Sequence, residues 1–377
     1  MGKHKRIIAY LLEYPLDLPG GAQMSTESLC RSLVNEKEAG FEPVVVCPSL
    51  LKKRPEDYPF RICTYGMGKN RIANLLVRTG AFKKILKELA PDIVHIQMPE
   101  SLITYEMAGI RGIPFVFTDR GMFAGYRKHT MFLMKRALRS ASVILTTTET
   151  NRKSWLEGSS FKNIERVSNT ISSAFADYDE TKRAGLYEER GGVFTIGMAG
   201  RICEEKDWPG AVELVRKLAD TGLKFRVSMV LSVFEDGDEE KVKSISDGII
   251  DAVGRENYVL RQDLTQEQMQ EYYYGLDVFV MTSVFESFGK AAVEAMSRKC
   301  AVIATDVGGL SEVIGKRENL YIPREGADKA VAYICHAAED EAFLHEEQEY
   351  FYSRYRENFS GERCLREHIR IYEEIGR

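Results

Sequence analysis

Short apolar runs alternate with stretches of helix-forming residues along almost the whole chain of 377 residues. Apolar runs bounded by turn residues are typical of buried parallel strands. Their alternation with helical stretches predicts parallel sheets that are covered by helices on both faces. A chain of this length favours two domains over one or three. We therefore expect an α/β protein with two doubly wound, Rossmann-like domains.

The candidate strands form two series. The first series covers residues 6–12, 43–47, 92–97, 114–118, 142–146 and 164–167. Residues 169–192 lack long apolar runs and are interpreted as an interdomain linker, which places the domain boundary between residues 172 and 173. The second series begins at Val193 and includes 225–231 and 276–281.

Ligands of doubly wound sheets bind at the carboxyl ends of the strands. In the first half of the chain, the residues at these ends are Gly20, Gly21, His95, Asp119, Arg120 and Asn169. The G-x-G-x-x-G spacing of a dinucleotide site is absent, so a nicotinamide cofactor is disfavoured. A buried structural histidine is as good an interpretation of His95 as a functional one.

Two cations follow the strand that begins at Val193. Arg201 and Lys206 stand five residues apart. A planar guanidinium and a compact ammonium at a strand end can clamp a diphosphate. The same spacing, taken alone, also fits an ordinary surface turn.

The segment Glu286–Glu294 follows the apolar run 276–281 and becomes helical in composition from Phe288. Gly289 leaves the backbone bare where the N–H groups of a helix start point outward, and such a terminus attracts phosphate. Glu286 is expected near the phosphate and Glu294 about two turns along the helix.

Three motifs resemble those of one enzyme family. The strings E-S-F-G-K-A-A-V-E-A-M at 286–296 and A-V-I-A-T-D-V-G-G-L-S-E-V-I at 301–314 resemble the donor-binding signature of retaining GT-B glycosyltransferases, glycosyltransferase family 4. G-R-I-C-E-E-K at 200–206 is similar to the G-R-x-x-x-x-K phosphate clamp of that family. The resemblance spans nearly the whole chain and is specific from about residue 193 to 315.

The resemblance implies two Rossmann-like domains that face each other across a cleft. Residues 1–172 would bind the acceptor, and a C-terminal helix at about 358–377 would pack back onto them. Residues 173–357 would bind the sugar nucleotide.

The resemblance also implies residue roles. Arg201, Lys206 and Glu286 would carry the catalysis, with Glu286 on the donor-sugar hydroxyls and Glu294 on the ribose hydroxyls. The expected donor-binding residues are Gly20, Gly21, Arg201, Lys206, Asp263, Leu264, Glu286, Ser287, Phe288, Gly289, Lys290 and Glu294. The expected acceptor-side residues are His95, Asp119, Arg120 and Asn169. The family often has histidine where this chain has Arg120, which leaves the acceptor-side chemistry open.

The implied activity is transfer of a sugar, with retention of anomeric configuration, from a nucleotide-diphosphate sugar to a saccharide acceptor. We expect a lipid-linked acceptor in surface polysaccharide or glycolipid synthesis, and a UDP-sugar in preference to a GDP-sugar. No D-x-D carboxylate pair stands at a suitable strand end, and residues 235–238 are interpreted as a loop, so no metal and no cofactor are expected. Two alternatives stay open: another GT-B enzyme, such as a sugar-nucleotide epimerase or a sugar phosphorylase, and a non-catalytic sugar-nucleotide-binding protein.

Charge is distributed unevenly along the chain. Residues 1–175 carry 26 Lys and Arg against 16 Asp and Glu, a net charge of +10, and the remainder carries −14. A basic half indicates an anionic partner surface. We expect this partner to be a membrane and not a nucleic acid, although a solvated basic face is the alternative.

Residues 126–139 form the candidate membrane-facing helix. At about 100° per residue, Lys128, Lys135 and Arg139 fall near one line, with Phe132 beside them. The opposite arc, expected to pack on the sheet, contains Met131, Leu133, Met134, Ala137 and Leu138. No signal peptide or membrane span is recognisable, and the seven cysteines form no C-x-x-C pair. We expect a cytoplasmic protein, peripheral on the inner face of the cell membrane.

Overall fold

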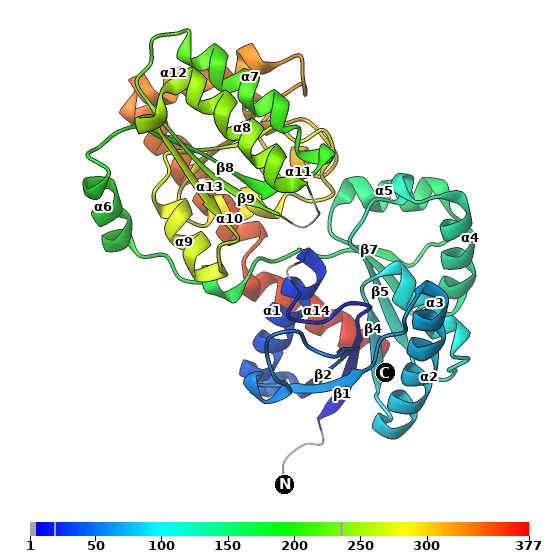
Figure 1. Ribbon diagram of the computed structural model, residues 1–377. Coiled ribbons are helices and arrows are strands. Elements are labelled where there is room, and N and C mark those ends of the chain that lie inside the picture. The colour runs from blue at the N-terminus through cyan, green and yellow to red at the C-terminus, as the bar shows by residue number, and fades with distance from the viewer. Residues whose placement is uncertain (1–4, 19, 234–236, 377) are drawn as a thin grey trace. The chain divides into compact units, whose positions relative to one another are not determined.

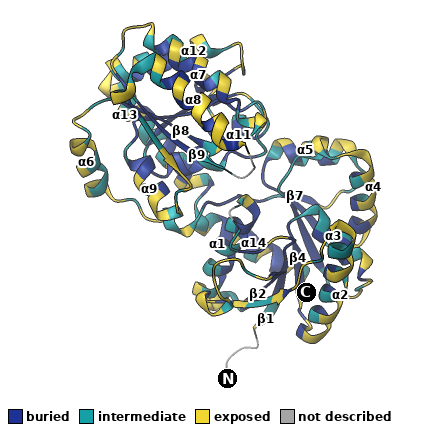
Figure 2. Cartoon of the chain, viewed as in Figure 1, coloured by how far each residue is buried: buried dark blue, intermediate teal, exposed yellow. Residues whose placement is uncertain are grey.

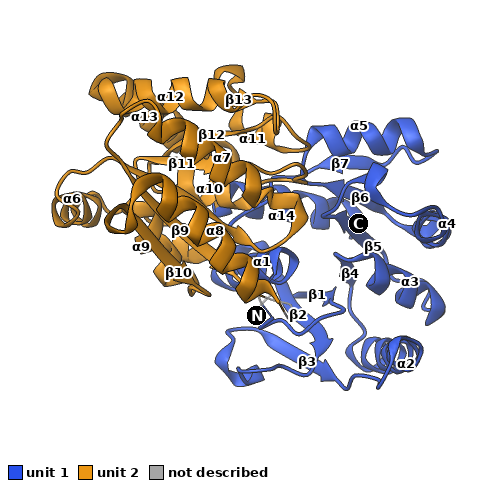
Figure 3. Cartoon of the chain, turned by 45° about the horizontal axis from the view of Figure 1, so that its top comes forward, with its two compact units in different colours: residues 1–171, 361–377 blue, residues 172–360 orange. Residues whose placement is uncertain are grey.

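A computed structural model describes residues 5–18, 20–233 and 237–376. The chain divides into two compact units, one ending at Ile171 and including the segment from Gly361, and the other spanning Ser172–Ser360 (Figure 3). The division falls one residue before the expected boundary. Each unit contains one parallel sheet between layers of helices (Figure 1).

The first unit has a seven-stranded sheet in the order β3-β2-β1-β4-β5-β6-β7. Its strands are β1 (Arg6–Leu11), β2 (Phe41–Pro48), β3 (Arg61–Tyr65), β4 (Ile93–Ile96), β5 (Phe115–Asp119), β6 (Val143–Thr146) and β7 (Ile164–Arg166). The strand order reverses between β1 and β4, which is where doubly wound sheets place their ligands. The edge strand β3 escapes the sequence analysis because most of its residues are partly or fully exposed.

Helices cover both faces of this sheet. They are α1 (Gly21–Asn35), α2 (Arg71–Leu89), α3 (Pro99–Met107), α4 (Lys128–Ala137), α5 (Glu149–Gly158) and α14 (Gly361–Ile375). Helices α2 to α5 contribute to one hydrophobic core, and α1 and α14 contribute to the core on the opposite face. The last helix of the chain, α14, thus belongs to the first unit, where it contacts α1 (Figure 1).

The second unit has a six-stranded sheet in the order β10-β9-β8-β11-β12-β13. Its strands are β8 (Thr195–Arg201), β9 (Arg226–Ser232), β10 (Tyr258–Gln262), β11 (Val278–Met281), β12 (Ala301–Thr305) and β13 (Leu320–Tyr321). Its helices are α6 (Glu180–Glu189), α7 (Trp208–Ala219), α8 (Asp238–Val253), α9 (Gln266–Tyr274), α10 (Lys290–Met296), α11 (Leu310–Ile314), α12 (Ala327–Glu339) and α13 (Glu341–Asn358). The prediction of two doubly wound α/β sheets is confirmed.

Two predicted segments differ in the structure. Helix α6 lies inside the expected linker 169–192, where the Asp179 side chain accepts a hydrogen bond from Lys182 N at 3.1 Å and caps the helix. Because α6 buries none of its residues, it has no apolar face that periodicity could reveal. Helix α8 begins at Asp238, which was expected in a loop, while Glu235 and Asp236 lie outside the described residues.

The other differences concern helix ends. Helix α10 begins at Lys290 and not at Phe288, because Phe288 is buried against Phe359 and Gly289 has a φ of +95°. Helix α4 ends at Ala137, so Arg139 lies in a separate 3₁₀ turn. Leu133, expected against the sheet, is 42% exposed.

Candidate functional site

Two adjacent strands bring the predicted catalytic residues to one edge of the second sheet. Strand β8 ends at Arg201 and pairs in parallel with β11, whose carboxyl end leads into the loop that carries Glu286. Lys206 Nζ lies 2.6 Å from Glu286 Oε2, and both side chains are 18% exposed. The Arg201 side chain is exposed and forms no hydrogen bond or ion pair with a described residue.

Backbone contacts fix the Arg201–Lys206 loop against the loop that follows β11. Val284 N donates to Glu205 O at 2.9 Å, and the Thr282 hydroxyl donates to Lys206 O at 2.8 Å. On the other side, the Trp208 indole donates to Arg201 O at 2.9 Å. The two cations and Glu286 therefore belong to one connected set of loops at the carboxyl edge of the sheet.

The pair Gly308–Gly309 supports the backbone of Glu286. Gly309 N donates to Glu286 O at 2.9 Å. Gly308 has a φ of +51°, and a Cβ atom there would lie 2.0 Å from the same carbonyl oxygen. These glycines lie within a recognised motif, but their role could not be predicted, because the contact joins two loops that are distant in the chain.

Glu294 lies on the second turn of α10 and is buried. The Tyr273 hydroxyl donates to Glu294 Oε2 at 3.0 Å. Burial raises the pKa of Glu294, while the charge of Lys290 and this hydrogen bond oppose the shift. Tyr273 was not predicted as a site residue, since a tyrosine in a helical stretch gives no signal of its long-range partner.

The remaining donor-side predictions lie in two places. Asp263 and Leu264 follow β10, and Asp263 is exposed with a φ of +49°. Gly20 and Gly21 belong to the first unit, at the start of α1. Gly20 has extended backbone at a φ of −178°, so its backbone conformation does not require glycine.

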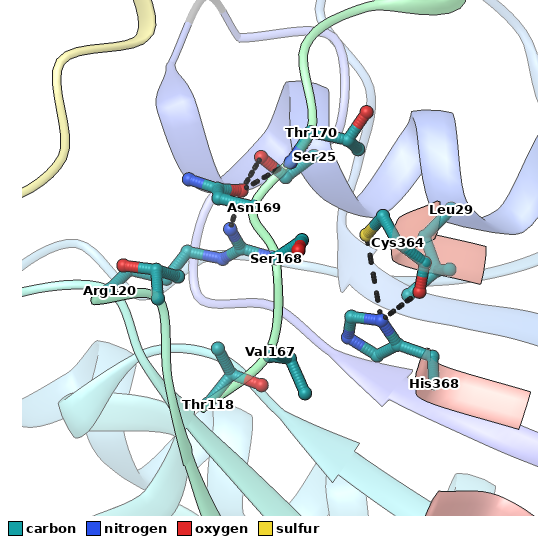
Figure 4. Close-up of a pocket in the computed structure, with 11 residues that line it drawn as sticks. Ser25, Leu29, Thr118, Arg120, Val167, Ser168, Asn169, Thr170, Cys364 and His368 are labelled. Carbon is teal, nitrogen blue, oxygen red and sulfur yellow. Dashed lines mark hydrogen bonds between the residues drawn. The ribbon is translucent and has the colours of Figure 1, made fainter. Parts of the chain in front are cut away.

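On the acceptor side, Arg120 and Asn169 line a pocket of the first unit (Figure 4). Arg120 Nε donates to Gln97 Oε1 at 2.7 Å, and Nη1 donates to Asn169 Oδ1 at 2.8 Å. The other lining residues are Ser25, Leu29, Thr118, Thr147, Val167, Ser168, Thr170, Cys364 and His368. Burial lowers the pKa of Arg120 to about 10, so it keeps its positive charge at neutral pH.

The other two predicted acceptor-side residues, Asp119 and His95, are held by hydrogen bonds within the first unit. Asp119 is fully buried and accepts hydrogen bonds from the Tyr126 hydroxyl, Gly121 N, the Asn151 amide and the Trp155 indole. His95 is also fully buried, and its two ring nitrogens each lie 2.7 Å from a hydroxyl, of Tyr372 and of Thr118. Burial holds the pKa of His95 well below its ordinary value. For His95, this geometry supports the structural interpretation.

Within the described ranges, no group of three or more His, Cys, Asp or Glu residues is arranged to hold a metal ion. Among the helices of the described residues, none is both long and apolar enough to cross a membrane.

The two parallel sheets define a protein of two doubly wound α/β units, and comparison with known proteins identifies the family. The family described as "Glycosyl transferases group 1" matches residues 180–357, and "Glycosyltransferase Family 4" matches residues 19–175. The chain belongs to the GT-B glycosyltransferases of the family 4 type.

Two relatives show how far the similarity extends. The chain is 34% identical over 191 residues to the 2-deoxystreptamine glucosyltransferase of Streptomyces kanamyceticus, covering 48% of this chain and 46% of that protein. It is 25% identical over 356 residues to the putative teichuronic acid biosynthesis glycosyltransferase TuaC of Bacillus subtilis, covering 83% and 84%. The match therefore spans about half the length of the first relative and most of the second.

Solved structures have the same fold. The sucrose-phosphate synthase of Thermosynechococcus elongatus superposes with a TM-score of 0.82 at 16% identity, covering 98% of this chain and 99% of that one. The Anabaena protein HepE, in complex with UDP and glucose, superposes with a TM-score of 0.80 at 14% identity, covering 98% and 100%. At these identities the likeness establishes the fold alone.

Proposed function

We propose that this chain is a retaining glycosyltransferase that binds a nucleotide-diphosphate sugar at the carboxyl edge of the second sheet. The observation that carries the proposal is the meeting of Arg201, Lys206 and Glu286 at that edge. Arg201 is exposed at the end of β8, and Lys206, in the loop that follows, is joined to Glu286 at 2.6 Å. Two cations suit a diphosphate, and a carboxylate accepts hydrogen bonds from sugar hydroxyls.

The proposed chemistry places the cations at the leaving group. Negative charge develops on the phosphate oxygen as the glycosidic bond breaks, and preorganised cations lower the barrier to that step. Lys206 is held by Glu286 before any donor arrives, so little reorganisation is needed. The acceptor hydroxyl would attack from the face that the phosphate leaves and pass its proton to the phosphate, which retains the configuration. No metal ion and no cofactor enter this scheme.

We assign the nucleoside end to Glu294 and the residues after β10. The buried Glu294 carboxylate, oriented by Tyr273, would accept hydrogen bonds from the two ribose hydroxyls. Asp263 and Leu264 would lie near the base. We favour UDP over GDP as the nucleotide, and the HepE structures that contain UDP and UDP-glucose are consistent with this choice.

The experiment that tests this function has a binding step and a turnover step. A thermal-shift screen should show stabilisation by UDP or GDP, and less by the matching monophosphate. Incubation of the preferred UDP-sugar with saccharide and lipid-linked acceptors should then give product in excess chelator. Proton NMR should show the anomeric configuration of the donor in the new linkage. An inverted product, or turnover that stops with chelator, contradicts the proposal.

We further propose that the first unit binds an anionic membrane surface, where a lipid-linked acceptor for surface polysaccharide or glycolipid synthesis would be found. The net charge of +10 in residues 1–175 supports this. Phe132 of α4 is 70% exposed, as a membrane-facing aromatic would be. Lys135, however, donates to Gly158 O at 2.9 Å, so α4 offers less free charge than its sequence indicates.

Helix α2 extends the proposed membrane surface. Ile72 and Leu76 are 74% and 62% exposed in its first turns. Lys83, Lys84 and Lys87 are exposed further along the helix. Figure 2 shows exposed residues on α2. At about 100° per residue, Ile72, Leu76, Lys83 and Lys87 lie within about 60° of one another. Apolar and basic residues on one exposed face suit the interface of an anionic bilayer.

A further inference from the structure

We propose that Arg120 and Asn169 bind the negatively charged group, a carboxylate or a phosphate, of a sugar substrate. The site is the pocket at the carboxyl edge of the first sheet (Figure 4). The charged sugar would be the acceptor or the transferred sugar of the donor. This inference rests on the proposed function, because it assigns the pocket to a substrate of that reaction.

The positive charge of Arg120 is not balanced by its hydrogen-bond partners. Both hydrogen-bond partners of Arg120 are neutral amide oxygens, of Gln97 and Asn169. Arg120 forms no ion pair with any carboxylate in the described part of the chain. The adjacent carboxylate, Asp119, is fully buried and accepts hydrogen bonds from four other groups. A partly buried cation without a counter-charge is costly, and a bound anion would offset that cost.

Arg120 and Asn169 each keep an N–H donor that no described residue uses. Arg120 uses Nε and Nη1 and leaves Nη2 without a partner among the described residues. Asn169 Oδ1 accepts from Arg120 Nη1 and from Thr170 N, which fills its two lone pairs, and the Ser25 hydroxyl lies 3.2 Å away (Figure 4). The Asn169 amide nitrogen has no partner within the described ranges. Arg120 and Asn169 can therefore both donate hydrogen bonds to one oxyanion.

Two buried residues, Ser168 and His368, also line the pocket. The Ser168 hydroxyl is buried, with 1% of the residue exposed, and has no partner among the described residues. His368 places Nδ1 2.8 Å from the Cys364 carbonyl oxygen, so Nδ1 carries the hydrogen. Burial lowers the pKa of His368 to about 4, so it adds no second charge. Ser168 thus offers a further donor, and Arg120 is the cation among the lining residues.

The test compares charged sugars with neutral ones on the whole chain. In the first arm, saturating UDP occupies the diphosphate site, and calorimetry measures binding of methyl glucuronide, glucose 6-phosphate and methyl glucoside. In the second arm, UDP-glucuronic acid is compared with UDP-glucose. We expect one arm to show a preference of about tenfold or more for the charged sugar, the scale of one charge-assisted contact. The arm that shows it identifies the source of the anion.

Three variants decide whether Arg120 is responsible. Arg120→Gln should lose the preference and keep the parental UDP affinity, whereas Arg61→Gln, which alters an exposed arginine of the same unit, should keep both. Asn169→Asp places a carboxylate beside Arg120 and should also abolish the preference, which guards against misfolding of Arg120→Gln. Equal binding of charged and neutral sugars in both arms, or an undiminished preference in Arg120→Gln and Asn169→Asp, overturns the inference. Failure of UDP itself to bind is a failure of the proposed function.

Discussion

Glu13 is a buried carboxyl at the carboxyl end of β1, 5% exposed, beside the point where the strand order reverses. It accepts a hydrogen bond from Ser101 N at 3.0 Å, at the start of α3. Burial, followed by the charge of Glu100, raises the pKa of Glu13 to about 7. The folded state therefore holds this proton more tightly than the unfolded state does.

The raised pKa predicts a specific dependence of stability on pH. As the pH rises from about 4.5 to about 7, the parent should lose about 3 kcal/mol of unfolding free energy relative to Glu13→Gln. Glutamine keeps an oxygen that can accept from Ser101 N but does not titrate. Urea unfolding of both proteins across this range measures the difference. A difference that stays constant with pH would show that Glu13 titrates normally.

Neutralising Glu294 and neutralising Glu286 should affect different steps of the proposed reaction. Glu294→Gln should mainly weaken UDP binding, because the carboxylate would hold the ribose, whereas Glu286→Gln should mainly slow transfer. The loss of one hydrogen bond to a charged group is about 1.5–3 kcal/mol. Tyr273→Phe should weaken UDP binding by less, since it removes only the group that orients Glu294. Calorimetry and turnover measured on all three variants separate the effects, and parental UDP affinity in Glu294→Gln would refute the ribose role.

At the scale of elements, the loop that carries Glu286 depends on the loop after β12. Gly308→Ala would add a Cβ atom 2.0 Å from Glu286 O and would also strain a positive φ. Gly222→Ala is the matched control, since Gly222 has a φ of +83° and nothing within 4 Å of the added atom. Gly222→Ala should cost about 1 kcal/mol of stability and leave turnover unchanged. Gly308→Ala should cost more and reduce turnover; equal effects of the two substitutions would contradict the proposed support of Glu286.

Most strands could be predicted from the sequence, because parallel strands that are buried on both faces consist of apolar runs. The motifs could be placed at the ends of these strands. Strand β3 and helix α6 could not, since neither carries a buried apolar run or face. The motifs predicted a common site for Arg201, Lys206 and Glu286, whereas the ion pair between Lys206 and Glu286 was not predicted. The contacts of Tyr273 and Gly308 join segments distant in the chain, and local sequence patterns do not encode such contacts.

For the whole molecule, the uneven charge predicts binding to anionic liposomes that weakens with salt. Lys83, Lys84 and Lys87 changed together to Glu should reduce co-sedimentation, because each basic residue near an anionic surface contributes about 1 kcal/mol. The triple change of Lys128, Lys135 and Arg139 to Glu should have a smaller effect, since Lys135 is engaged by Gly158. Equal sedimentation with neutral and anionic liposomes would show that α2 and α4 have only a structural role.

The central claim is that the donor diphosphate binds between Arg201 and Lys206, and calorimetry of UDP binding tests it most directly. Lys224→Ala is the control, because Lys224 is exposed and lies at the amino end of β9, at the opposite edge of the same sheet. Arg201→Ala and Lys206→Ala should each weaken UDP binding by about 10- to 150-fold, the loss of one charge-assisted contact. Lys224→Ala should bind UDP as the parent does. Parental affinity in both Arg201→Ala and Lys206→Ala would contradict the account.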